Sequence, residues 1–155
     1  EYMKSRLYMI LSIVGFLGIL VIELLSDYLN QFIQISIVSM NQLFFETSAL
    51  ISPFLVGISF IFLVPVIEEF FFRKVLLEFF GKHSNTIGII VSSFLFALPH
   101  LVIFKPLTMV PQMLIVIILG LIYIKGNRNI YIPIGAHVIG NLFIFLSMNI
   151  TNSSL

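Results

Sequence analysis

The sequence predicts an all-α protein, a polytopic bundle of transmembrane helices. Of its 155 residues, 59% are hydrophobic and only 10% are charged, whereas charged residues make up about a quarter of an average soluble domain. Its mean hydropathy is +1.14, and apolar stretches long enough to cross a bilayer recur along the chain. We expect a single integral-membrane domain over residues 1–155 with about five to six spans, because no internal repeat or low-complexity linker divides it.

The composition also excludes several classes of function. A net charge of +1 without any basic cluster argues against a nucleic-acid partner. The absence of cysteine excludes disulfides, thiolate metal ligands and a cysteine nucleophile. The chemistry of this protein must therefore come from its few ionisable and polar side chains, in contact with membrane lipid.

Five stretches reach the length of about 20 apolar residues that a helix needs to cross the hydrocarbon core. They are residues 7–25, 49–80, 86–104, 107–124 and 130–148. The first is too long for the apolar part of a signal peptide, so we interpret it as a retained helix. Residues 28–46 mix polar and apolar side chains without Lys or Arg, which favours an interfacial helix over a re-entrant segment or a poor span. Residues 149–155 are predicted to be a polar tail.

The stretch 49–80 is too long for a simple span. As one helix it would measure ~48 Å against a hydrocarbon core of ~30 Å. Either Pro53 or Pro65 should therefore break it, or the helix tilts and protrudes. Gly81 is the expected end of this helix, and Ser84 or Asn85 the expected N-cap of the next.

The distribution of basic residues predicts the orientation. With the N-terminus on the cytoplasmic side, almost all Lys and Arg residues of the helix ends lie inside, and only Lys105 lies outside. The inner residues are Lys4, Arg6, Lys74, Lys82, Lys125 and Arg128. The inverted arrangement fits this rule much less well.

The most informative residues are ionisable side chains inside an apolar span. Glu68, Glu69 and Arg73 interrupt the otherwise apolar run 49–80. A charge at membrane depth is costly, so it indicates a functional site. Glu69 and Arg73 are four residues apart and are predicted to pair directly. Taken alone, the three residues would also fit an ion pair that merely braces the helix.

Polar residues on two other spans reach a similar depth. His100 lies on the third span, and His137 and Asn141 share one face of the fifth. At 1.5 Å per residue, these side chains and Glu68 all lie about 12–22 Å from the inner ends of their helices. Since a lone histidine is more often a packing residue than a catalyst, it is this convergence that favours a site. We expect a core of four helices around one polar cavity.

These residues resemble the CPBP intramembrane proteases, also called the CAAX-protease and bacteriocin-processing, or Abi, family. The similarity lies in three ordered motifs, each on its own apolar helix. They are Glu68-Glu69-x-x-x-Arg73, Phe96-x-x-x-His100 and His137-x-x-x-Asn141. One such motif alone would be weak, whereas the ordered set is specific. The resemblance places a protease-like core at about residues 49–148.

The resemblance implies a membrane-embedded endopeptidase in which a glutamate and a histidine activate water. Glu68 would be the general base, and His100 would share or orient the water. His137 and Asn141 would donate hydrogen bonds to the oxyanion that forms on the scissile carbonyl.

The remaining motif residues would support this site. Glu69 and Arg73 would form an ion pair that holds the helix register, and Phe96 would pack beside His100. A metal-assisted reaction is the alternative, with a divalent ion such as zinc. Its ligands would be Glu68, His100 and His137, although the His-Glu-x-x-His signature of soluble zinc proteases is absent.

The resemblance also suggests a substrate class and a location. The substrate would be a membrane-associated peptide or protein, in some relatives lipidated, and the small size suggests a bacterial cell-membrane protein. Bacteriocin maturation, peptide-signal processing and self-immunity are the roles linked to bacterial relatives. The rival hypotheses are a non-catalytic immunity or scaffold protein and a small proton-coupled carrier.

Overall fold

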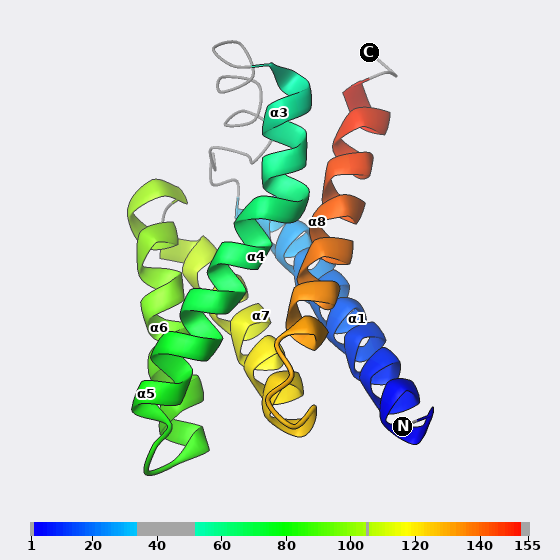
Figure 1. Ribbon diagram of the computed structural model, residues 1–155. Helices are drawn as coiled ribbons and strands as arrows, with labels where there is room; N and C mark the ends of the chain where they lie inside the picture. The colour runs from blue at the N-terminus through cyan, green and yellow to red at the C-terminus, as the bar shows by residue number, and fades with distance from the viewer. Residues whose placement is uncertain (1, 34–51, 105, 153–155) are drawn as a thin grey trace.

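The computed structural model describes residues 2–33, 52–104 and 106–152, and its regular structure is entirely helical within these ranges (Figure 1). The helical units are α1 (Tyr2–Ile33), a long helix built from α3, η1, α4, η2 and α5, then α6 (Asn85–Phe104), α7 (Pro106–Lys125) and α8 (Tyr131–Asn152). The predicted all-α bundle is confirmed. No β-strand occurs in the described part of the chain.

The long helix begins at Pro53 and continues through Pro65. Its five segments are α3 (Pro53–Ile58), η1 (Ser59–Leu63), α4 (Val64–Glu69), η2 (Phe70–Leu77) and α5 (Glu78–Phe80), of which η1 and η2 are π-helical. Pro65 lies in the first turn of α4, where the preceding π-turn changes the hydrogen-bond register without ending the helix. Of the outcomes expected for this stretch, the break at Pro65 is therefore wrong. Figure 1 shows α3 standing upright and α4 slanting below it.

Two predicted boundaries need correction. Residues 28–33 continue α1 instead of starting a separate interfacial segment, and residues 34–46 of that segment lie outside the described part of the chain. The predicted tail from residue 149 is helical as far as Asn152. Propagation adds one hydrogen bond for each residue fixed, so a helix continues past the apolar residues that suggested its ends.

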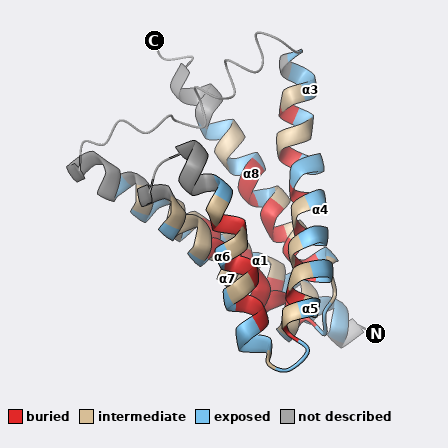
Figure 2. Ribbon diagram, turned by 90° about the vertical axis from the view of Figure 1, so that its left-hand side faces the viewer, coloured by how far each residue is buried: buried red, intermediate tan, exposed pale blue. Residues whose placement is uncertain are grey.

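The helices pack so that α1 covers one side of a four-helix core. α1 contacts α7 and α8, α6 contacts α7 and η2, and α8 also contacts η1 and α4. Buried apolar residues from three helices join α1 to the core: Leu11, Ile19, Ile115, Leu119, Ile122, Ile132 and Ala136. Figure 2 shows buried stretches on α8 and along the α3–α5 helix, with exposed residues on their outer sides.

The helices have the apolarity of membrane spans. Lys4–Ser26 and Phe54–Phe80 are long and apolar enough to cross a bilayer, and Asn85–Pro99, Met109–Lys125 and Tyr131–Ser147 are shorter apolar helices. The start of α1 and the α5–α6 and α7–α8 turns lie at one end of the bundle, and the end of α8 lies at the other (Figure 1). This arrangement is the one that the distribution of basic residues requires, and the cytoplasmic N-terminus stays a prediction.

Candidate functional site

The centre of the candidate site is a fully buried ion pair on the long helix. The Arg73 Nε–H donates to Glu69 Oε2 at 2.7 Å, and Arg73 Nη2 donates to Glu69 Oε1 at 3.2 Å. Both side chains are 0% exposed, so each charge depends on the other for compensation in a low-dielectric interior. The predicted pairing of Glu69 with Arg73 is confirmed.

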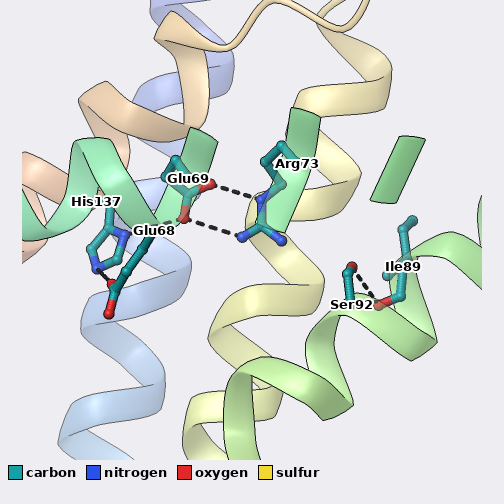
Figure 3. Close-up of polar contacts among 6 residues, drawn as sticks. All are labelled: Glu68, Glu69, Arg73, Ile89, Ser92 and His137. Carbon is teal, nitrogen blue, oxygen red and sulfur yellow. Dashed lines mark hydrogen bonds and ion pairs between the residues drawn. The ribbon is translucent and has the colours of Figure 1, made fainter. Parts of the chain in front are cut away.

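His137 joins this pair from α8. Its Nδ1 lies 3.2 Å from Glu69 Oε1, and its Nε2 lies 3.8 Å from Glu68 Oε2 (Figure 3). An ionised carboxylate can only accept hydrogen bonds, so His137 donates its Nδ1–H to Glu69. The other ring nitrogen is thereby turned towards Glu68. The imidazole is thus held between the two neighbouring carboxylates.

The two glutamates have different environments. The side chain of Glu68 is 27% exposed, whereas that of Glu69 is sealed at 0%. The 3.8 Å between Glu68 and His137 is too long for a direct hydrogen bond, but a water lying about 2.8 Å from each atom would bridge them. Glu68 is therefore the carboxylate that solvent or substrate can reach.

Asn141 binds a backbone carbonyl that the long helix leaves free. In η1 the Val64 N–H bonds to the Ser59 carbonyl, five residues back. In this register the carbonyl of Phe60 would accept from residue 65, but Pro65 has no N–H. The Asn141 Nδ2–H donates to this Phe60 carbonyl at 2.9 Å. One of the two amide protons of Asn141 is therefore used between the helices, and the second is left for other partners.

α6 contributes buried polar and aromatic groups beside the long helix. Phe96 packs edge-on against Phe72, with ring centroids 4.8 Å apart. Ser92 Oγ donates to the Ile89 carbonyl at 3.2 Å (Figure 3). Ser93 Oγ and Arg73 Nη1 are buried and have no hydrogen-bond partner among the described residues. Unpaired buried donors are costly, so each of these two groups would be stabilised by a polar partner.

His100 belongs to α6, but its side chain lies outside the described side chains. The convergence predicted from the sequence is thus observed for Glu68 and His137, and the position of His100 relative to them stays a prediction. Asn141 lies on the same helix as His137, and its amide binds the carbonyl of Phe60, about two helical turns before Glu68.

Of the three expected metal ligands, the structure describes the side chains of Glu68 and His137. Among all the described residues, no group of three or more His, Cys, Asp or Glu residues is arranged to hold a metal ion. His137 directs Nδ1 to a carboxylate that is already paired with Arg73, so this nitrogen is not free to bind a metal. The expected ligand set includes His100, and a metal at this site therefore stays a prediction.

The Phe60 carbonyl is a group of the site that was not predicted from the sequence. The sequence feature that could have indicated it is Pro65, because a proline leaves one carbonyl in the preceding turn without its helical partner. Which carbonyl is left free depends on whether that turn is an α-turn or a π-turn. Only the folded chain decides this.

Comparison with known proteins gives one family. Residues 50–143, more than half of the chain, match a family model described as type II CAAX prenyl endopeptidase Rce1-like. The match includes all the predicted site residues. Searches of curated proteins and of solved structures each gave no match.

Proposed function

The chain belongs to the type II CAAX prenyl endopeptidase Rce1-like family, and from this premise we propose that Glu68 activates the water that cleaves a peptide bond. The match bears out the resemblance to CAAX proteases drawn from the sequence motifs. Together with the apolar helices, it indicates a membrane protein of a protease family. The substrate that we propose is a membrane-associated peptide or protein.

The observation that supports this role for Glu68 is the contrast with its neighbour. Glu69 is sealed and bonded to both Arg73 and His137, whereas Glu68 is partly exposed and faces His137 Nε2 across 3.8 Å. A general base must reach both the water and the substrate. Glu68 meets this condition, and Glu69 instead compensates the buried guanidinium and orients the imidazole.

In the proposed reaction, Glu68 first accepts a proton and later returns it. The carboxylate takes a proton from water as the water oxygen bonds to the scissile carbonyl carbon, and the carbonyl oxygen becomes an oxyanion. As the carbon–nitrogen bond breaks, Glu68 returns the proton to the leaving amine. His100 would orient the water.

His137 and Asn141 are proposed to stabilise the oxyanion. Because Nδ1–H of His137 is already donated to Glu69, only Nε2 can serve, and it must then be protonated. With both ring nitrogens protonated, His137 would carry one positive charge. The formal charges of His137, Glu68, Glu69 and Arg73 would then sum to zero. The second amide proton of Asn141 would be the other donor.

The proposal includes no step that requires a metal. If a divalent ion such as zinc binds, the expected ligands are Glu68, His100 and His137, and it would polarise the scissile carbonyl or the water. Metal analysis of the purified protein, and cleavage measured with and without a chelator, test this directly. Full activity without metal would exclude this alternative.

The deciding experiment compares carboxylate variants of the purified full chain in detergent. The probe is a peptide pool that contains prenylated and unprenylated members, with products identified by mass spectrometry. Glu68→Gln should lower cleavage by at least about 10²-fold, while the unfolding temperature stays unchanged. Glu23→Gln, which removes a carboxylate on α1, is the matched control. Unchanged cleavage by Glu68→Gln would remove Glu68 from the mechanism.

The biological setting forms part of the proposal. We propose a bacterial cell-membrane protein with a cytoplasmic N-terminus that processes a bacteriocin precursor or a peptide signal, or that confers self-immunity. A non-catalytic scaffold makes a different prediction. In that case Glu68→Ala and His137→Ala variants would complement a deletion as well as the wild type does.

A further inference from the structure

A second polar site lies at the other end of the long helix from the Phe60 contact. A pocket of about 550 Å³ opens beside the α5–α6 and α7–α8 turns. Its charged lining residues are Lys74, Glu78, Lys82 and Arg128. Glu78 is ten residues beyond Glu68, and neither Glu68, Glu69 nor His137 lines the pocket, so this pocket is separate from the candidate catalytic site.

Among the described residues, Glu78 is the only carboxylate that lines the pocket, and it is already engaged. Tyr123 donates its hydroxyl to Glu78 Oε1 at 2.6 Å, and Arg128 Nη1 pairs with Glu78 Oε2. Lys74 Nζ donates to the Arg128 carbonyl at 3.2 Å, and Lys82 Nζ lies 5.2 Å from the centroid of the Phe79 ring. Among the described residues, neither lysine forms a salt bridge. The positive charges of Lys74 and Lys82 are therefore not compensated by any carboxylate in the part of the chain that the structure describes.

The position of Arg128 is held by the fold. Asn127 and Arg128 have φ values of 56° and 57°, a left-handed conformation that Asn adopts readily and that is uncommon for Arg. The Arg128 N–H bonds to the Tyr123 carbonyl at 2.9 Å, and its Nη2 donates to Asn85 Oδ1 at 3.0 Å. The α7–α8 turn is thus fixed against the start of α6, and the cationic pocket exists before any ligand binds.

An exposed apolar stripe continues from this pocket along the long helix. Phe71, Val75 and Phe79 follow at intervals of four residues and are 48%, 44% and 60% exposed. Their side chains lie on a helix that is apolar enough to span a membrane. A soluble anion would make no use of this stripe, whereas an acyl chain would lie against it.

We propose that the pocket binds the phosphate of an anionic phospholipid headgroup, with an acyl chain along Phe71, Val75 and Phe79. Basic pockets between helices at the membrane boundary are suited to such headgroups. Lys74 and Lys82 supply the charge that is not compensated within the protein, and Arg128 sets the shape of the pocket. This inference does not depend on the catalytic proposal, because it uses no residue of the Glu68 site.

The test is lipid retention by the purified full chain in detergent, measured by native mass spectrometry. The protein is titrated with phosphatidylglycerol or with zwitterionic phosphatidylcholine. We expect preferential retention of phosphatidylglycerol, and a loss of affinity of roughly fivefold for each lysine removed in Lys74→Gln and Lys82→Gln. The control pair is Lys4→Gln and Lys125→Gln, which removes the same charge outside the pocket and should leave affinity unchanged within about twofold.

Three outcomes would overturn the proposal. Equal losses from the two pairs would mean that only the total charge matters. Equal retention of the two lipids would remove the headgroup assignment. Displacement of phosphatidylglycerol by millimolar inorganic phosphate would assign the pocket to a free anion. Glu68→Gln should retain the lipid as the wild type does, so failure of the catalytic proposal remains distinguishable.

Discussion

Asn141 and Pro65 act on the same backbone carbonyl, that of Phe60. Pro65 removes the N–H that the π-register of η1 would supply, and Asn141 replaces it with a side-chain donor from α8. An unpaired carbonyl in this setting costs about 1–3 kcal/mol. The contact therefore stabilises the packing of α8 on the long helix and also fixes the orientation of the amide proposed to stabilise the oxyanion.

A double-mutant cycle tests this relation. Asn141→Ala should lower the free energy of unfolding by about 1–3 kcal/mol, because the Phe60 carbonyl loses its donor. Adding Pro65→Ala supplies a backbone N–H and should recover part of that loss, so the two changes are not additive. Thermal unfolding of the four proteins in detergent measures the coupling. Simple additivity would show that Asn141 does not compensate for Pro65.

Removing the charge of Glu69 should lower the stability of the fold far more than removing the charge of Glu68. Glu69→Gln leaves the fully buried Arg73 without a compensating charge and should lower stability by about 3–5 kcal/mol. Glu69→Leu combined with Arg73→Met removes both charges and should cost less than Glu69→Gln alone. Chemical or thermal unfolding in detergent gives the order. Glu68→Gln, at a partly exposed side chain, serves as the control and should change stability far less.

At the scale of elements, the long helix was predicted only in part. Helical spacing was sufficient to predict the Glu69–Arg73 pair, and common depth was sufficient to bring Glu68 and His137 together. The π-turns were not predictable, because a proline in an apolar run is equally compatible with a break, a kink or a register shift. Packing against α8 decides between them. The donor that satisfies Phe60 comes from a residue 81 positions away, and no local pattern contains that information.

At the scale of elements, a prediction concerns two glycines at the contact of α1 with α8. A Cβ on Gly15 would lie 2.9 Å from Ala136 Cβ, which cannot move aside, whereas among the described residues a Cβ on Gly135 would meet Ser12 Oγ alone, at 3.6 Å. Alanine raises helix propensity by up to about 1 kcal/mol in either place. Gly135→Ala should therefore be neutral or stabilising, and Gly15→Ala should destabilise by about 1–3 kcal/mol. Equal unfolding temperatures for the two variants would contradict this packing.

At the scale of the whole molecule, the bundle separates two kinds of chemistry. The acid–imidazole cluster lies inside, between the long helix and α8. Lys74 and Lys82, which pair with no carboxylate among the described residues, lie at the end where α5 meets α6. Such a division is consistent with the two proposals, a peptide bound in the interior and a charged headgroup bound at the rim. The helices alternate in direction from α1 to α8 (Figure 1). This alternation predicts on which side of the membrane each helix end lies.

The chain contains no cysteine, so single cysteines report topology without background. If the bundle crosses the membrane five times with the N-terminus inside, Ser5→Cys and His83→Cys should react with an impermeant maleimide only after permeabilisation. Ser147→Cys, near the other end of α8, should react in intact cells. Labelling of Ser5→Cys and Ser147→Cys from the same side would require an even number of crossings. The chain between α1 and α3 would then have to supply the additional span, against the interpretation of residues 28–46 as an interfacial segment.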